Sequence, residues 1–214
     1  MFFKKKISEP VKIILRNPGI NVNDLKKQTT SLSNIAETVN ELEKKQLIIT
    51  SYEKNERKLY PNPANNKTLK EYEAIEIEEL LKLEEKYPFI KKVERTSESI
   101  AGKLKDNLIS ILLFGSITTF KLAKKSDIDV IIITSKELTE KEQSMITKEF
   151  MDLNIEFKAD KIAHEVNVVW TTKKDYLSQL HNKTSFSQNL QKNHVLIKGV
   201  KEFIKITGVP LTSP

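Results

Sequence analysis

The sequence predicts an α+β protein in two parts that are joined by a helix. Three observations predict this class: short amphipathic helices followed by a strand-turn-strand pattern in residues 1–64, an unbroken helical stretch in residues 65–88, and aliphatic strands alternating with helices in residues 89–214. At 214 residues, the chain has the length of one to two domains. We therefore expect three short helices and a β-hairpin, then a connector helix, then a sheet with helices.

The composition excludes several classes of protein. Cysteine is absent, so disulfides, thiol catalysis and cysteine-ligated zinc are impossible. The hydrophobic content of 38% with 30% charged residues is ordinary for a globular protein. Apolar runs such as residues 111–114 are much shorter than a membrane-spanning helix. We expect a cytoplasmic protein that has no membrane partner.

The formal charge of +7 is unevenly distributed along the chain. Residues 1–63 carry 12 basic and 7 acidic side chains, residues 64–90 carry 4 and 7, and residues 91–214 carry 20 and 15. Two basic parts therefore flank an acidic connector. This pattern favours polyanions or nucleotides as ligands of both parts, although a lysine-rich proteome gives the same balance.

The first part shows helical periodicity followed by a hairpin pattern. A first helix ends at the Asn-Pro-Gly of residues 17–19, a second follows Asn21 or Asn23, and a third starts near Ser33. The third helix has apolar residues at helical spacing, namely Ile35, Val39 and Leu42. Residues 47–52 and 57–60 then read as two strands around a polar turn.

The segment LSNIAETVNELEKKQLIITSYEKNERKLYPNP, residues 32–63, resembles a winged helix-turn-helix DNA-binding domain. The resemblance implies a recognition helix at residues 33–45, a wing at residues 54–58 and double-stranded DNA as a partner. Two features depart from the family pattern: Gln46 replaces the usual glycine, and the recognition helix is rich in glutamate. A fold of this kind used for dimerisation or protein contact is the alternative. The DNA-binding residues implied by the resemblance are Ser33, Asn34, Thr38, Lys54, Arg57 and Lys58.

The connector contains no glycine or proline from residue 66 to residue 86, which predicts one helix of about five turns. Its acidic residues indicate a largely solvated surface with one apolar side. That side packs on a domain or on a second copy of the chain, so a homodimer and a simple spacer helix both remain open.

The second part contains two strands whose ends carry polar residues. The run LISILLF, residues 108–114, is followed at once by Gly115 and Ser116, and SDIDVIIIT begins ten residues later. Asp127 and Asp129 are two residues apart, so on a strand both carboxylates project to the same side. Paired carboxylates in one cleft require a cation between them, and Mg²⁺ meets that need.

The segment LLFGSITTFKLAKKSDIDVIII resembles the nucleotidyltransferase superfamily that includes DNA polymerase beta, especially its minimal branch. The resemblance covers about residues 89–207 and implies a mixed sheet with helices. It implies that Gly115 and Ser116 bind the phosphates of a nucleoside triphosphate, and that Asp127 and Asp129 are catalytic and hold Mg²⁺. In the loop after Gly-Ser, where the family often has other residues, this chain carries Lys121. Lys121 is either a phosphate ligand or a solvated lysine.

A third strand, EVNVVWTT, occupies residues 165–172. In the family this strand supplies a third carboxylate, and here Asn167 occupies its place. An amide cannot accept the proton of an attacking hydroxyl, so Glu165 is considered as a substitute on the same face. His164, His181 and His194 lack metal-ligand spacing and are read as solvated or core-edge residues, and Trp170 is read as core.

Three functions remain open. The first is a DNA-binding protein with a fused magnesium-dependent nucleotidyltransferase domain that acts on an unidentified hydroxyl acceptor. The second is a transcriptional regulator whose nucleotide-sensing domain is catalytically impaired, a reading based on Asn167. The third, suggested by the minimal branch, is an antitoxin-like module that binds a partner protein.

Overall fold

The computed structural model describes residues 2–30, 34–124, 126–182 and 184–208. The chain divides into two compact units: an N-terminal unit of Met1–Ile75 with Lys201–Pro214, and a C-terminal unit of Glu76–Val200. The last described helix therefore groups with the first residues, whereas the sequence led us to expect residues 89–214 together. The end of this helix packs within the N-terminal unit, because a Cβ on Gly208 would lie 3.0 Å from Cγ of Pro61.

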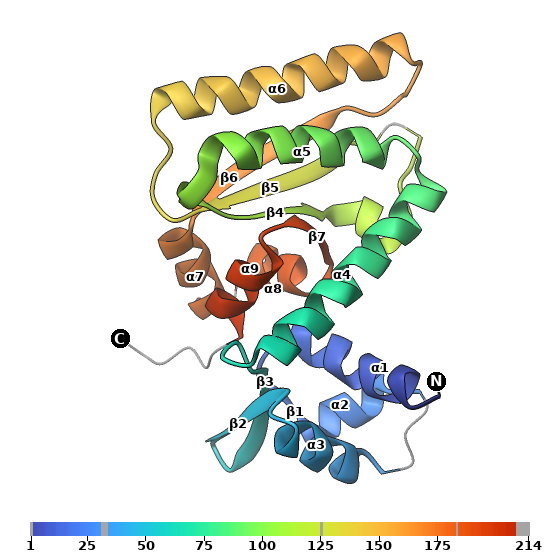
Figure 1. The fold of residues 1–214 in the computed structure, drawn as a ribbon, viewed down its shortest axis with the longest axis vertical. Coiled ribbons are helices and arrows are strands. Elements are labelled where there is room, and N and C mark those ends of the chain that lie inside the picture. The colour runs from blue at the N-terminus through green and yellow to red at the C-terminus, as the bar shows by residue number, and fades with distance from the viewer. Residues whose placement is uncertain (1, 31–33, 125, 183, 209–214) are drawn as a thin grey trace. The chain divides into compact units, whose positions relative to one another are not determined.

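The N-terminal unit contains helices and a small antiparallel sheet (Figure 1). In the described residues this sheet has the order β1-β3-β2. Its elements, with the last helix of the chain, are α1 (Phe2–Arg16), β1 (Ile20–Asn21), α2 (Val22–Gln28), α3 (Ile35–Lys44), β2 (Ile48–Glu53), β3 (Glu56–Pro61) and α9 (Val200–Thr207).

Local sequence explains where these helices and the hairpin begin. The side chain of Asn21 caps α2 by accepting the backbone N–H of Asp24 at 2.8 Å, which satisfies a donor that has no partner inside the helix. The β2–β3 hairpin turns at Lys54 and Asn55, whose φ angles of 49° and 65° are both positive. Two consecutive residues of this kind form the two-residue turn that matches strand twist.

The C-terminal unit is a sheet with helices on both faces, and in the described residues its strand order is β6-β5-β4-β7. The β4–β5 and β4–β7 pairs are antiparallel and β5–β6 is parallel, which confirms the expected mixed sheet. Its elements are α4 (Asn66–Lys86, which begins in the N-terminal unit), α5 (Ile90–Leu104), η1 (Lys105–Asn107), β4 (Leu108–Phe114), η2 (Gly115–Thr119), β5 (Ile128–Thr134), α6 (Glu140–Ala159), β6 (Val166–Thr172), α7 (Lys173–His181), α8 (Ser185–Lys192) and β7 (His194–Lys198).

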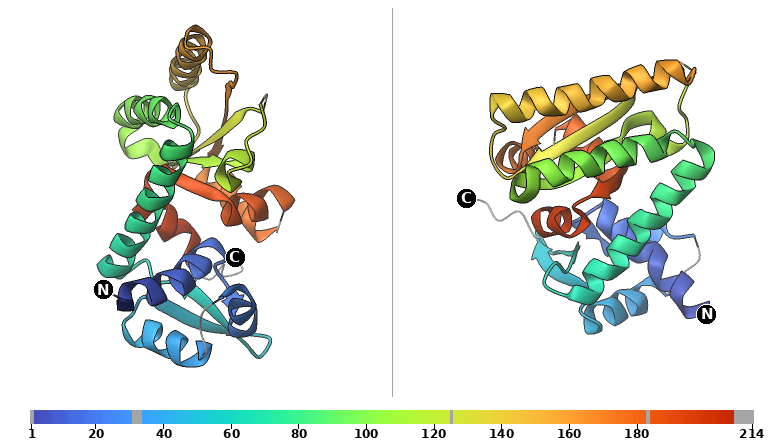
Figure 2. Two further views of the ribbon diagram at one scale, coloured as in Figure 1. Left: turned by 90° about the vertical axis from the view of Figure 1, so that its right-hand side faces the viewer. Right: turned by 45° about the horizontal axis from the view of Figure 1, so that its top comes forward.

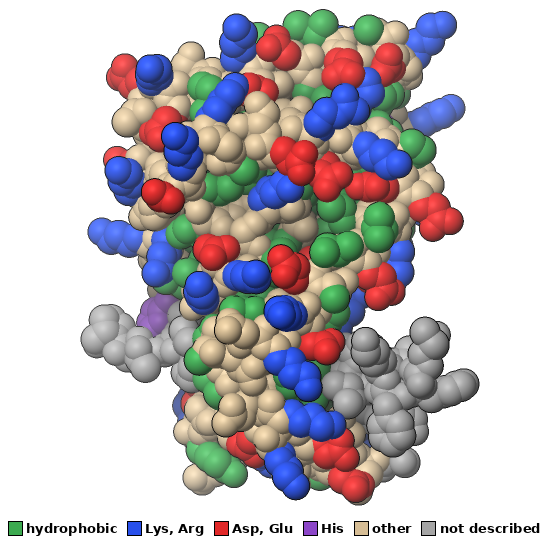
Figure 3. Space-filling view, viewed as in Figure 1, with side chains coloured by type: hydrophobic (Ala, Val, Ile, Leu, Met, Phe, Trp, Pro, Cys, Tyr) green, Lys and Arg blue, Asp and Glu red, His purple; other side chains and the backbone are tan. Residues whose placement is uncertain are grey.

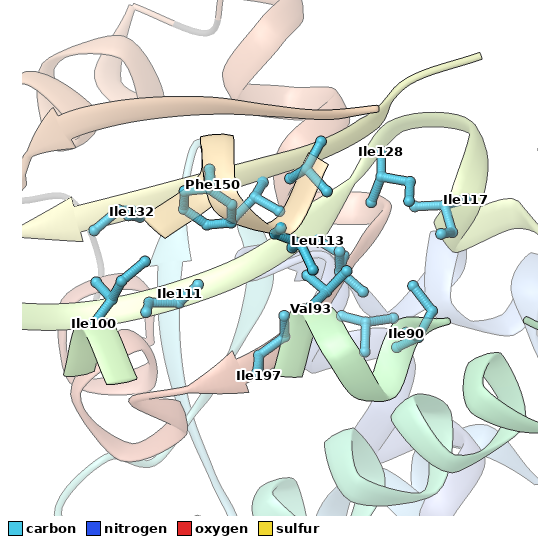
Figure 4. Packing of buried hydrophobic residues seen from close by; sticks show 14 of the residues in the cluster. Ile90, Val93, Ile100, Ile111, Leu113, Ile117, Ile128, Ile132, Phe150 and Ile197 are labelled. Carbon is cyan, nitrogen blue, oxygen red and sulfur yellow. The ribbon is translucent and has the colours of Figure 1, made fainter. Parts of the chain in front are cut away.

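The main core lies between the sheet and the pair α5 and α6, which cover one face of it (Figures 1 and 2). Alternate residues of β4 and β5 point into this layer, among them Leu113, Ile128 and Ile132 (Figure 4). Because successive strand residues face opposite sides, Asp129 lies on the other face of the sheet. Its register partners Phe114 on β4 and Asn167 on β6 share that face.

The expectation that Trp170 belongs to the core is wrong. Trp170 lies on β6, which in the described residues pairs on one side only, with β5, and the tryptophan is 37% exposed. An edge strand has no neighbour to cover its outer side, so an aromatic residue there stays in contact with solvent.

The connector helix has the bounds that the sequence predicts, as α4 shows. Within the C-terminal unit, the buried carboxylate of Glu76 accepts the backbone N–H of Leu196 on β7 at 2.9 Å. Ile77 and Leu81 are exposed on the same helix, and the homodimer through this helix stays a prediction. Among the described residues, no helix combines the length and the apolar character needed to cross a membrane.

Candidate functional site

The candidate site lies at the end of β4, where the chain turns through Gly115. Gly115 has a φ of +78°, and a Cβ built on it would lie 2.7 Å from Oδ2 of Asp129. Two features favour glycine here: the left-handed backbone, and the Asp129 carboxylate that lies directly against the turn. Ser116 follows in η2, where its carbonyl accepts the backbone N–H of Lys121 at 3.1 Å. The structure thus brings the Gly-Ser turn and Asp129 together.

Asp127 directly precedes β5, and Asp129 is the second residue of that strand. Partial burial raises the pKa of the Asp129 carboxyl above its usual value, and the negative charge of Asp127 raises it further. The hydrogen bond from Asn167 acts in the opposite direction. The charge of Asp127 therefore acts on Asp129, and the sharing of a cation by the two carboxylates stays a prediction.

Asn167, and not Glu165, lies beside the aspartates. Nδ2 of Asn167 donates to Oδ1 of Asp129 at 3.2 Å across the β5–β6 pair. Glu165 precedes β6 and forms an ion pair with Lys158 at 3.0 Å. Glu165 therefore does not replace the third carboxylate of the family. The position of β6 beside Asp129 carries the amide of Asn167.

Two supporting residues have no signal in the sequence pattern. Nζ of Lys86 donates to the carbonyl of Phe120 at 2.7 Å and lies over the rings of Tyr87 and Phe120, so it holds the end of the Gly-Ser turn. Nδ1 of His164 lies 2.9 Å from the carbonyl of Ser126, directly before Asp127. Both contacts join segments far apart in the chain, so local spacing could not reveal them.

The remaining predicted site residues are Lys121 in the C-terminal unit and the DNA-binding candidates of the N-terminal unit. Lys121 directly follows the turn, and its side chain is exposed. Ser33 lies outside the described residues. Asn34 caps α3 by accepting the backbone N–H of Glu37 at 3.3 Å, and the hydroxyl of Thr38 donates to the carbonyl of Asn34 at 3.2 Å.

The wing residues differ in the hydrogen bonds that their side chains form with other residues of the chain. Lys54 is exposed at the hairpin turn. Arg57 donates to Glu43 at 2.5 Å and to Asn40 at 3.0 Å, and Lys58 donates to Glu56 at 2.6 Å. On the face drawn in Figure 3, basic and acidic side chains are interspersed, so no single charge dominates that face.

The oxygen donors at the site fit Mg²⁺. Within the described residues, no group of three or more His, Cys, Asp or Glu side chains is arranged to hold a metal. Mg²⁺ needs no such cage, because it is usually bound by one or two carboxylates, by water and by the phosphates of a substrate. Asp127 and Asp129 supply two carboxylates. A divalent cation bound between them would neutralise their negative charge.

Comparisons with known proteins support a nucleotidyltransferase domain in this part of the chain. Residues 98–199, just under half of the protein, match the family model described as "Polymerase beta, Nucleotidyltransferase". The match includes the Gly-Ser turn, both aspartates and Asn167. No curated protein matches the chain.

Among solved structures, one chain described as "Crystal structure of the toxin-antitoxin with AMP-PNP" is similar to this protein at 15% sequence identity and a TM-score of 0.33. The overlap covers 53% of this chain and 78% of that one. A TM-score this low does not support a shared fold.

Proposed function

We propose that the C-terminal unit binds a magnesium nucleoside triphosphate and transfers its nucleotidyl group to a hydroxyl acceptor, with pyrophosphate as the leaving group. The observation that carries this proposal is the Asp129 carboxylate lying against the Gly115 turn, with Asp127 beside it. A turn that contains glycine lets a phosphate come close to the backbone and bind its N–H groups, while the adjacent carboxylates bind a cation.

In this proposal each residue of the site has a defined role. The Ser116 hydroxyl and the backbone of η2 bind phosphate oxygens, and Asn167 orients the Asp129 carboxylate through its hydrogen bond. Held by Asp127 and Asp129, Mg²⁺ would neutralise charge on the triphosphate. The acceptor oxygen attacks the α-phosphorus as the bond to the β-phosphate breaks. Asn167 cannot take the acceptor proton, which must pass to water or to a substrate phosphate.

Incubation with α-labelled triphosphates and Mg²⁺ tests the proposal directly. Transfer of label to protein or to small-molecule acceptors, with release of pyrophosphate, is the expected result. If the protein neither binds triphosphate in a Mg²⁺-dependent manner nor transfers label, the proposal is wrong.

Asn167→Asp is expected to raise the rate of transfer. The new carboxylate would lie beside Asp129, where it adds a metal ligand and a proton acceptor, and general-base assistance contributes on the order of 10²-fold. The rate of label transfer in saturating Mg²⁺ is the measurement. The control is Asn182→Asp, at an exposed position at the end of α7. Asn154 on α6 is not used, because its side chain forms hydrogen bonds with the backbone of Val166. An unchanged or lower rate in Asn167→Asp would contradict the role given to this position.

A second candidate function is a regulator that binds nucleotide without transferring it. Asn167 in place of the third carboxylate is the observation that favours it. This candidate predicts Mg²⁺-dependent nucleotide binding with no label transfer by the natural protein. It also predicts that transfer appears only in Asn167→Asp.

DNA binding by the N-terminal unit is the further part of the proposal. Its support is the α2–α3 pair followed by a hairpin whose turn carries an exposed lysine, Lys54. Arg57 gives a poor test of phosphate contact, because its removal also breaks the ion pair with Glu43. Lys54 gives a cleaner test.

Lys54→Ala is expected to weaken DNA retention in a gel-shift assay against genomic fragments. Loss of one phosphate contact lowers the slope of log affinity against log salt by about 1. Lys70→Ala, an exposed lysine on α4, is the matched control and should leave retention unchanged. Retention of DNA by Lys54→Ala with the salt dependence of the natural protein would rule out this contact.

A further inference from the structure

An exposed aromatic side chain lies next to the candidate site. Phe186, in the first turn of α8, is 37% exposed. Its ring meets the ring of Phe114 with centroids 5.7 Å apart and planes at 88°. This edge-to-face contact is a favoured arrangement of two aromatic rings, and it holds Phe186 in position while leaving part of its surface open.

Phe114 connects this ring to the carboxylates. It is the last residue of β4, directly before Gly115, and it is the register partner of Asp129 on β5. Directly opposed residues in an antiparallel pair project from the same face, with their Cβ atoms about 5 Å apart. Phe186 therefore lies one aromatic ring away from the side chain that would bind Mg²⁺.

A second contact holds the end of α8 against the phosphate-binding turn. The hydroxyl of Thr118 in η2 lies 2.9 Å from the carbonyl of Gly115 and 3.2 Å from the carbonyl of Asn193. Asn193 is the residue that ends α8. The helix that carries Phe186 is thus attached to the turn at one end and to Phe114 near the other.

We propose that Phe186 is the platform on which the base of the nucleotide stacks, and that the preferred substrates are purine nucleoside triphosphates. This inference rests on the proposed function, because it takes the phosphates to lie at Gly115 and Ser116. In a nucleotide, one ribose separates the base from the α-phosphate. In this chain, the ring of Phe114 separates the Gly115 turn from the ring of Phe186. Stacking on an aromatic ring is available to every base, and it favours purines because of their larger ring surface.

Equilibrium binding of three probes in Mg²⁺ tests this inference: ATP, CTP and inorganic tripolyphosphate. In Phe186→Ala we expect ATP affinity to fall about tenfold, the preference for ATP over CTP to shrink, and tripolyphosphate affinity to stay unchanged. Phe186→Trp should keep the ATP affinity. Met151→Ala, an exposed apolar residue on α6, is the control and should alter none of the three.

Two results would overturn the inference: unchanged ATP affinity in Phe186→Ala, or an equal loss of ATP and tripolyphosphate. Asp129→Asn separates it from the proposed function. If Asp129→Asn weakens ATP and tripolyphosphate while Phe186→Ala weakens neither, the metal-dependent site stands and the platform is wrong. If Phe186→Ala weakens ATP alone while Asp129→Asn has no effect on either ligand, the platform stands and the metal-dependent site is wrong.

Discussion

Asp129→Asn is expected to lower the rate of nucleotidyl transfer by about 10³-fold or more, equivalent to ~4 kcal/mol of transition-state stabilisation. The change removes one of the two carboxylates that would hold Mg²⁺ against the Gly115 turn. Asparagine has nearly the same shape, so the loss would come from charge and not from a cavity. Label transfer from α-labelled triphosphate in excess Mg²⁺ is the measurement.

The same substitution is expected to leave the protein as stable as before, or slightly more stable, at neutral pH. Partial burial and the neighbouring Asp127 raise the pKa of Asp129, so the folded protein holds this proton more tightly than the unfolded chain does. The stability contributed by the protonated carboxyl is present at low pH and is lost as pH rises through the raised pKa. A neutral asparagine does not carry that cost at pH 7.

Asp152→Asn is the matched control, because Asp152 is exposed on α6. It should retain the full rate. Transfer by Asp129→Asn at a rate close to that of the natural protein would refute the assignment of the site. A large fall in melting temperature would instead show that Asp129 acts mainly in folding.

Gly199→Ala is expected to destabilise the C-terminal unit by about 3–5 kcal/mol, since backbone strain and overpacking each cost 1–3 kcal/mol. A Cβ at this position would lie 1.9 Å from the carbonyl oxygen of Ile109 and 2.8 Å from Cα of Ser110, and φ is +75°. The obstacle is backbone of β4, so no side-chain rotation can relieve it. The register of β4 against β7 also shifts near this point, between Ile111 and Leu112.

Gly102→Ala is the control, because nothing lies within 4 Å of a Cβ built at that position in α5. It should stabilise the protein by about 0.5–1 kcal/mol through helix propensity. Urea unfolding followed by the fluorescence of Trp170, the single tryptophan of the chain, reports on the C-terminal unit. Equal unfolding midpoints for the two variants would contradict the clash.

Much of the secondary structure could be predicted because its causes are local. The aliphatic run of β4 ends at Gly115, and α4 has the predicted bounds because no glycine or proline interrupts it. The capping box of Thr139 and Glu142 starts α6, and both of its hydrogen bonds are present. These signals lie within a few residues of the feature that they determine.

The parts of the site that could not be predicted depend on contacts between distant segments. The parity of β6 left Asn167 and Glu165 as alternatives, and the parallel β5–β6 register places Asn167 against Asp129. Lys86 and His164 bond to backbone carbonyls 34 and 38 residues away. Trp170 became exposed because its strand lies at an edge, which the apolar pattern of one strand does not reveal.

By itself, the order of residues determined that a Gly-Ser turn follows one aliphatic strand and that two carboxylates spaced by one residue lead the next. Strand geometry alternates side chains, so the prediction that Asp127 and Asp129 project to the same side follows from their spacing. Only the tertiary structure decided the neighbours of this region, namely an amide from β6 beside Asp129 and an aromatic ring from α8 against Phe114. The reason is physical: strand pairing and helix packing select neighbours by burial and hydrogen bonding over the whole chain, and that selection sets the chemistry of the site.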